Sequence, residues 1–201
     1  METLILARHA LAWSNANGVV SSTPPGLGLT PEGARQAGSL GAALALDELD
    51  LGVSTELART RETLEIVCAG RAIPCVVVPG LNEIEFGAFE GGAVVDYRAW
   101  ARAALSTTPC PGRGESRAAA VGRYVEAYTE LLGRPERVAL VVGHALPIRY
   151  VLDAALGLPP AALMTPVEHA VPHRLSRSEL ERAVALLAGW ARAPRFRAPS
   201  S

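Results

Sequence analysis

Two histidines of this chain each follow an apolar run with the composition of a buried strand. Thr3–Ala7 leads into Arg8 and His9, and Val138–Val142 leads through a glycine into His144. Short runs rich in aliphatic and β-branched residues are typical of strands covered on both faces. Because ligands of open α/β sheets bind at the carboxyl ends of strands, we expect these side chains to lie around one pocket. Two imidazoles beside a guanidinium would suit a phosphorylated substrate.

The chemistry of phosphoryl transfer explains why the arginines matter. A phosphoryl group in transfer spreads negative charge over its equatorial oxygens, so catalysis consists mainly of positioning and electrostatic stabilisation. A guanidinium suits this task because it offers a planar fork of donors to two oxygens. Arg8 adjoins His9, and Arg59 follows the short apolar run Leu51–Ser54. Arg61 competes for the second position, but the spacing from the end of that run favours Arg59.

A nucleophile and an acid complete the requirement. A histidine attacks phosphorus only when it is neutral, and its ordinary pKa of about 6.5 allows this near neutral pH. A nearby carboxylic acid would protonate the leaving oxygen. Glu83 and Glu85 are the candidates, and both lie in the glycine-punctuated segment Gly80–Gly92. Strand-like alternation would place both carboxyl groups on the same face.

The segments that must position these residues alternate between strand and helix patterns. Strands are expected at Thr3–Ala7, Leu51–Ser54, Ile73–Pro79 and Val138–Val142. Helices are expected at Thr30–Leu46, Leu57–Ala69, Val94–Leu105, Ser116–Leu132, from about His144 to Leu156, and at Ser176–Trp190. Val167–Leu175 has an extended pattern, and the residues after Ala193 are expected to fray. The alternation predicts an α/β fold, a three-layer α/β/α arrangement with a mostly parallel central sheet.

Length and composition bound the class of protein. The chain has 201 residues, of which 49% are hydrophobic and 19% charged, as in a globular protein. We expect one domain over residues 1–201, with a core at about 3–158 and a C-terminal extended segment and helix at about 166–192. The formal net charge of −1 offers no global field for nucleic acid or an anionic membrane.

The compartment is expected to be the cytoplasm. The first apolar run is too short for a secretory signal and has no basic leader, and no stretch reaches the length of a membrane span. Cys68, Cys75 and Cys110 are an odd number without metal-ligand spacing, which favours thiols in a reducing compartment. The oligomeric state is left open, a homodimer being one option.

Blocks of residues along the chain resemble the histidine phosphatase superfamily, in its phosphoglycerate-mutase-like branch. They occur in that family's order between Leu4 and about Leu158. The blocks are Arg8-His9 with Asn15, Leu29–Gly33, Ser54–Thr63, Leu81–Gly91, Gly114–Ser116 and Gly143-His144. The resemblance implies a phosphoglycerate mutase-like fold and hydrolysis of small-molecule phosphate monoesters.

The resemblance also implies roles for individual residues. His9 would be the nucleophile that becomes phosphohistidine. Glu83 would protonate the leaving group and then act as the base for water. The phosphate and substrate pocket would be lined by Arg8, Arg59, Asn15, His144 and Ala145. No metal or cofactor is implied.

The sequence departs from the family pattern at two usual glycines. Ala10 follows the first histidine and Ala145 the second, while Leu11 and Ala12 replace an acidic residue and a hydroxyl. Extra methyl groups would crowd backbone that approaches the phosphate closely. The two alanines leave open a phosphatase with a slow pocket or a non-catalytic phosphate-binding homologue. The resemblance to the family leaves open a third interpretation, a mutase that returns the phosphoryl group to a sugar acid.

Two further patterns carry weaker hypotheses. His169 and His173 are four residues apart, which on a helix would allow metal binding. Pro172 argues against a helix there, so both histidines are expected near the pocket rim or on the surface. Glu115 and Ser116 are expected to open a helix, with Ser116 as its cap.

Overall fold

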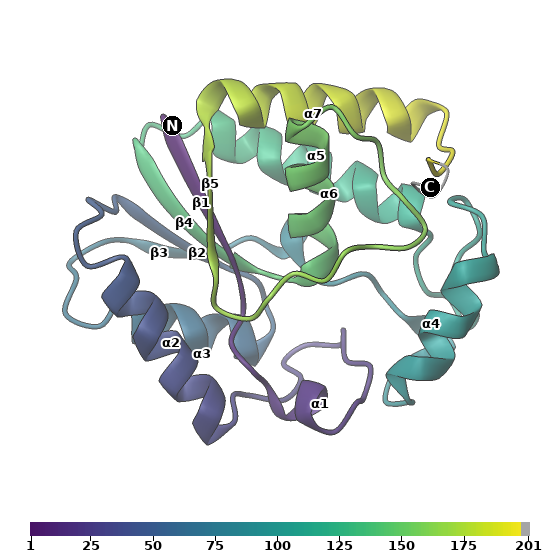
Figure 1. The fold of residues 1–201 in the computed structure, drawn as a ribbon, viewed down its shortest axis with the longest axis horizontal. Coiled ribbons are helices and arrows are strands. Elements are labelled where there is room, and N and C mark those ends of the chain that lie inside the picture. The colour runs from purple at the N-terminus through teal and green to yellow at the C-terminus, as the bar shows by residue number, and fades with distance from the viewer. Residues whose placement is uncertain (198–201) are drawn as a thin grey trace.

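A five-stranded sheet forms the middle layer of the computed structural model, which describes residues 1–197 (Figure 1). Its strands are β1 (Thr3–Arg8), β2 (Leu51–Ser54), β3 (Cys75–Val77), β4 (Val138–Gly143) and β5 (Pro172–Ser176). Their order is β3-β2-β4-β1-β5, and only β5 runs antiparallel to its neighbour. The predicted mostly parallel sheet is therefore confirmed.

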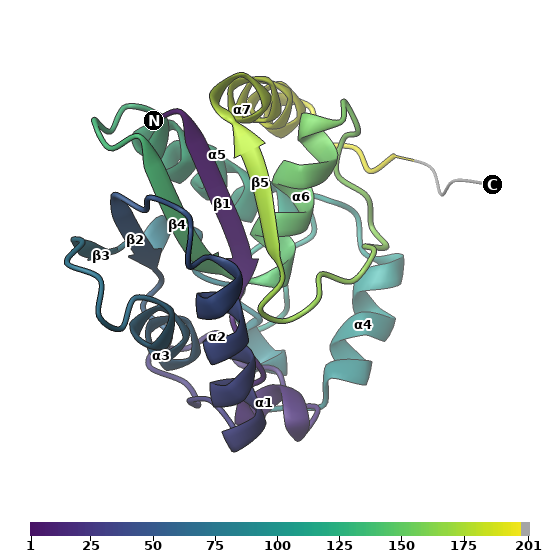
Figure 2. The same ribbon diagram turned by 60° about the vertical axis from the view of Figure 1, so that its left-hand side comes forward.

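Helices cover both faces of the sheet, as the sequence predicts. The helices are α1 (Trp13–Ala16), α2 (Pro31–Ala43), α3 (Ala58–Val67), α4 (Val94–Ala103), α5 (Arg117–Leu132), α6 (Ala145–Ala155) and α7 (Arg177–Arg192). α2 and α3 lie on one face, and α5, α6 and α7 lie on the other (Figures 1 and 2). α1 and α4 lie beyond the carboxyl end of β1, away from the sheet faces.

The central strand β1 shows how the sequence builds the two faces. Its side chains point alternately to opposite sides, because a strand has a period of two. Leu4 and Leu6 belong to the core under α5, α6 and α7, whereas Ile5 and Ala7 belong to the core under α2 and α3. All four are at most 1% exposed, which explains the unbroken apolar run.

Predicted helix starts are confirmed at three positions. Thr30 accepts from the backbone of Gly33 at 2.9 Å, with Pro31 as the first residue of α2. Ser116 caps α5, and Ser176 forms a capping box with Glu179 at the start of α7. These caps fix where each helix begins and hence which residues face the sheet.

Several predicted boundaries are wrong. The helix expected at Thr30–Leu46 ends at Ala43, and the strand expected at Ile73–Pro79 pairs only over Cys75–Val77, because prolines flank it and one begins a 3₁₀ turn at Pro79–Leu81. Of Val167–Leu175, only the part from Pro172 belongs to a strand paired with β1, while His169 forms an isolated bridge with Arg8. The helix α1 falls in a segment expected to be a loop.

The chain after Ala193 is packed where fraying is expected. The indole of Trp190 donates to the carbonyl of Arg195 at 2.7 Å, and the guanidinium of Arg197 lies 3.1 Å from Asp153. The remainder of that expectation, residues 198–201, lies outside the described residues. Within residues 1–197, no helix combines the length and apolarity needed to traverse a bilayer.

Candidate active site

The pairing of β1 with β4 brings the two histidines together. Arg8 pairs with Gly143, so His9 and His144 leave the sheet at the same level. The backbone N–H of His9 donates to Gly143 O at 2.9 Å. The two ring centroids are 5.4 Å apart, and the residues are 2% and 0% exposed. The expected convergence of the imidazoles is therefore found.

Hydrogen bonds fix the proton on the ring of His9. Its Nδ1 lies 2.8 Å from the carbonyl oxygen of Ala10, which only accepts, so Nδ1 carries the hydrogen. Nε2 then holds a lone pair, and it accepts from Arg59 Nε at 3.1 Å. Burial, with Arg59 as the next cause, lowers the pKa of His9 well below its ordinary value. The ring is therefore neutral with its nucleophilic nitrogen on the side of the guanidinium.

His144 is held in the opposite tautomer. Its Nδ1 lies 3.3 Å from Arg59 Nη2, and a guanidinium only donates, so Nδ1 accepts. Its Nε2–H donates to Thr55 Oγ1 at 2.9 Å, and that hydroxyl lies 2.9 Å from Thr60 Oγ1. Burial, followed by the charge of Arg59, lowers the pKa of His144 well below its ordinary value. Its ring is therefore fixed and neutral, but, contrary to expectation, His144 is not among the described residues that line the cavity beside His9.

The guanidiniums of Arg8 and Arg59 retain unused donors. Arg8 Nη1 donates to Val167 O at 2.8 Å, while Arg59 enters from the first turn of α3 and is 3% exposed. Within residues 1–197, Arg8 Nε and Arg59 Nη1 are buried N–H groups with no hydrogen-bond partner. Because unpaired buried donors are costly, these two N–H groups are available to an anion that enters the site. Arg61 is exposed and donates to a backbone carbonyl instead.

Glu83 faces the same hollow as Arg8 and His9. Its Oε1 accepts from the N–H of Ile84 at 3.1 Å. Burial raises the pKa of the carboxyl group, against the opposing charges of Arg59 and Arg8, and so favours the protonated acid. Glu85 is exposed and does not line this hollow, although both glutamates border a second one. The segment is not a strand, so the alternation from which a shared face was expected is absent.

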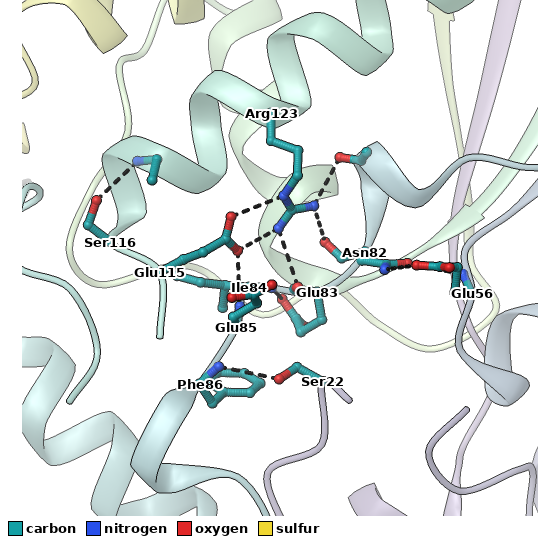
Figure 3. Close-up of polar contacts among 12 residues, drawn as sticks. Ser22, Glu56, Asn82, Glu83, Ile84, Glu85, Phe86, Glu115, Ser116 and Arg123 are labelled. Atoms are coloured by element: carbon teal, nitrogen blue, oxygen red, sulfur yellow. Dashed lines mark hydrogen bonds and ion pairs between the residues drawn. The ribbon is translucent and has the colours of Figure 1, made fainter. Parts of the chain in front are cut away.

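The backbone beside Glu83 is held by the ion pair of Arg123 and Glu115 (Figure 3). Arg123 donates to the carbonyls of Gly80 and Asn82, both at 3.0 Å, and its Nη2 lies 2.6 Å from Glu115 Oε2. The same Glu115 oxygen accepts from the N–H of Glu85 at 3.0 Å. The pair thus clamps the segment on both sides of Glu83. Sequence reasoning missed this role, although it noted Glu115.

Asn15 and Ala145 also line the hollow. Asn15 Oδ1 accepts from Ala12 N at 3.2 Å at the start of α1, so the side chain also stabilises its own loop. Ala145 is the first residue of α6. Ala10 is buried, and its N–H donates to Thr63 Oγ1 at 3.1 Å. The methyl groups at the two usual glycine positions leave the histidine rings in contact.

His169 lies closer to the centre of the site than its expected place at the rim. Its Nδ1 is 2.7 Å from His9 O, and its ring centroid is 5.3 Å from that of His9. Burial and then the charge of Arg8 lower its pKa to about 4. His173 instead sits in β5 beside Leu6. In the described part of the chain, no group of three or more His, Cys, Asp or Glu side chains is placed to hold a metal.

The hollow is a cavity of about 590 Å³. Its charged lining residues are Arg8, Arg59, Arg98, Arg102, Arg117 and Glu83. One wall is apolar and includes Leu163 and Met164, which leaves room for a substrate body beyond the phosphate. The arginines of α4 and α5 were missed because neither helix start carries a sequence signal for a binding site.

Comparison with known proteins places this geometry in context. The sequence model of the Histidine phosphatase superfamily (branch 1) matches residues 4–190. The chain is 28% identical to "Adenosylcobalamin/alpha-ribazole phosphatase" of Escherichia coli (strain K12), over 80% of this chain and 82% of that protein. It is 29% identical to "Probable phosphoglycerate mutase GpmB" of Proteus mirabilis (strain HI4320), over 65% and 64% of the two chains.

Solved structures share the architecture. The structure of Bacillus stearothermophilus YhfR superimposes with a TM-score of 0.75 at 26% identity, over 86% of this chain and 89% of that one. A mycobacterial glucosyl-3-phosphoglycerate phosphatase in complex with VO3 gives a TM-score of 0.75 at 24% identity, over 88% and 93%. The latter likeness concerns the fold alone.

Proposed function

Because the chain belongs to the histidine phosphatase superfamily (branch 1), we propose that it hydrolyses small-molecule phosphate monoesters through a phosphohistidine at His9. The observation that carries the proposal is the set of unused donors around one nucleophile. Arg8 Nε and Arg59 Nη1 are buried without a partner within residues 1–197, beside a histidine whose Nε2 holds a lone pair. A phosphate group would satisfy both donors.

The first step transfers the phosphoryl group to the enzyme. Arg59 turns from His9 Nε2 to the phosphate oxygens, and the freed lone pair forms the N–P bond. The P–O bond to the leaving group breaks, and its electron pair stays on that oxygen. Glu83, whose pKa is raised by burial, gives its proton to the same oxygen. The guanidiniums stabilise the charge on the transferring group.

The second step returns the enzyme to its starting form. The Glu83 carboxylate accepts a proton from water, whose oxygen attacks phosphorus. The N–P bond breaks, its electrons return to His9 Nε2, and inorganic phosphate leaves. Glu83 thus transfers the proton in both steps, and the guanidiniums of Arg8 and Arg59 stabilise the charge of the phosphoryl group. No metal is assigned a role in these steps.

The test is hydrolysis of phenyl phosphate and of a panel of phosphorylated metabolites. We expect the wild type to release phosphate and His9→Ala to release none above background. Turnover by the variant at the wild-type rate would overturn the mechanism. Wild-type protein that binds phosphate but turns over no substrate would favour the non-catalytic alternative.

A mutase is the second candidate, because two matched relatives carry the name phosphoglycerate mutase. In that reaction the phosphohistidine returns its phosphoryl group to a sugar acid instead of water. The discriminating assay asks whether 2,3-bisphosphoglycerate supports isomerisation of 3-phosphoglycerate. We expect phosphate release to exceed isomerisation; faster isomerisation would favour the mutase.

A further inference from the structure

One face of α4 forms a wall of the active-site cavity. The residues on that face are Val94, Tyr97, Arg98, Ala101 and Arg102. Their spacing of three and four residues is the helical repeat, so the cavity sees a continuous stripe of the helix. Arg98 and Arg102 are exposed and lie on adjacent turns. Burial lowers the pKa of the Arg8 guanidinium; the charge of Glu83 opposes this shift and that of Arg98 adds to it.

Arg117 enters the same cavity from the start of α5 but is buried, with 9% of its surface exposed. Its Nη1 donates to Tyr150 OH at 2.7 Å, and that hydroxyl donates to Ala161 O at 3.0 Å. These partners orient the guanidinium without neutralising it. A buried cation normally requires an anionic partner, because its removal from water is costly.

Other arginines of this chain that are largely covered do pair with carboxylates. Arg123 pairs with Glu115 at 2.6 Å, and Arg149 pairs with Asp153 at 3.3 Å. Among residues 1–197, by contrast, no ion pair involves the three cavity arginines 98, 102 and 117. Glu83 is the single carboxylate on the cavity lining, against five guanidiniums. A phosphate bound by Arg8 and Arg59 leaves the remaining three without a counter-charge.

We propose that Arg98, Arg102 and Arg117 form a second anion subsite, so that the preferred substrate carries another anionic group, a carboxylate or phosphate, on its leaving-group side. The inference rests on the proposed phosphatase function. Arg117 supplies an oriented donor, fixed by Tyr150, at the inner side of this subsite. The two α4 arginines supply charge from its solvent side. Selection for a substrate with two negative groups follows from this arrangement.

Matched aryl phosphates test the subsite directly. The substrates are 4-carboxyphenyl phosphate and 4-carbamoylphenyl phosphate, which have nearly the same shape but differ by one charge. The measured quantity is the ratio of their kcat/KM values. We expect the wild type to favour the carboxylate by about tenfold or more, since a hydrogen bond to a charged group contributes on this scale. The preference should weaken as salt rises.

The variants are Arg98→Gln/Arg102→Gln and, separately, Arg117→Gln. We expect each to lower the ratio about tenfold, mainly through KM for the carboxylated substrate. The exposed α4 pair keeps the test valid if Arg117→Gln fails to fold. Arg182→Ala removes an exposed arginine from α7 and serves as the control, with an unchanged ratio expected. A ratio near one in the wild type, or one unaffected by the α4 variants, would overturn the subsite.

A binding assay separates this inference from the phosphatase proposal. Calorimetry with 4-carboxyphenylphosphonate and phenylphosphonate needs no turnover. If neither ester is hydrolysed but the carboxylated phosphonate binds about tenfold tighter and loses that advantage in the α4 variant, the subsite stands and the phosphatase proposal fails. If both esters are hydrolysed equally and both phosphonates bind equally, the phosphatase stands and the subsite fails.

Discussion

Arg59 Nε lies 3.1 Å from His9 Nε2, so the guanidinium donates to the lone pair that would attack phosphorus. The same side chain approaches His144 Nδ1 at 3.3 Å. Burial, and after it the charge of this one arginine, lowers the pKa of both rings. Under the proposed function, a phosphoryl group on its way to His9 Nε2 would need the place that this guanidinium takes. Binding of the substrate must therefore move Arg59 from imidazole to phosphate, which couples release of the nucleophile to the arrival of its target.

The pH dependence of turnover should reflect Glu83 on its basic side. Burial raises the pKa of this carboxyl group, so the proton needed by the leaving group is lost only as pH rises through that raised value. The pKa of His9 is lowered, so the nucleophile is lost as pH falls through a value below its ordinary range. We expect a bell-shaped kcat profile with phenyl phosphate, and Glu83→Gln should lose the basic limb.

Ionisation of phenyl phosphate also changes the rate with pH, but it does so equally in the wild type and in Glu83→Gln. A limb of the profile that only the variant loses therefore belongs to Glu83. The variant should also lose about 10²–10⁴-fold in kcat, the usual contribution of general acid catalysis. An unaltered basic limb in Glu83→Gln would assign the proton donor elsewhere.

Loosening the Arg123 clamp should impair proton donation more than binding. In Arg123→Gln the segment around Glu83 loses three hydrogen bonds to its backbone carbonyls and the ion pair to Glu115. We expect kcat to fall about tenfold with phenyl phosphate, whose leaving group needs a proton, and by less with p-nitrophenyl phosphate, whose leaving group departs as the anion. KM should change little for either substrate.

Arg134→Gln provides a matched control for the clamp. Arg134 makes a similar pair with Glu136, at 2.6 Å and with similar exposure, away from the active site. Its removal should leave both rates intact. Equal losses with the two substrates in Arg123→Gln would indicate a general structural role instead of positioning of Glu83.

Two glycines of α2 should respond oppositely to alanine. A Cβ atom on Gly33 would lie 2.1 Å from the carbonyl oxygen of Leu11, whereas one on Gly38 would meet no atom within 4 Å. Gly33→Ala should therefore lower the free energy of unfolding by about 1–3 kcal/mol, the usual cost of overpacking. Gly38→Ala should raise it by about 0.5–1 kcal/mol, because alanine favours the helix.

Urea unfolding of both variants measures these changes. Gly33 lets the start of α2 approach the loop that follows His9, where Thr30 N donates to Leu11 O at 3.0 Å. The two substitutions share a helix and differ mainly in the space around the added methyl. A Gly33→Ala protein as stable as Gly38→Ala would contradict this close approach.

The fold was predictable where each element carries its own signal. The apolar run before His9 indicates a buried strand, and Thr30-Pro31 indicates a helix start because the cap and the proline act locally. Arg59 could be preferred over Arg61 because its place in the first turn of α3 follows from the end of β2. Signals of this kind depend only on neighbouring residues in the sequence, so they can be recognised before the tertiary contacts are known.

The remainder of the site depends on contacts that no local pattern encodes. His169 reaches His9 O from an irregular segment that precedes the edge strand β5. In the sequence, nothing distinguishes Arg123 from the other arginines of amphipathic helices. Its role appears only in the structure, where the loop around Glu83 packs against it. Arg117 follows the predicted cap Ser116, and no sequence pattern indicates that its side chain lines the cavity. In each case the sequence specifies the side chain, and only the packed structure specifies its partner.

The most direct test is capture of the covalent intermediate. Protein mixed with a ³²P-labelled aryl phosphate and quenched in alkali within milliseconds should carry label that is stable in base and released in acid, as expected of a phosphoramidate. Mass spectrometry should place that phosphate on His9, and His9→Ala should carry none. Rapid turnover with no labelled protein at any quench time, or with label on another residue, would contradict the account.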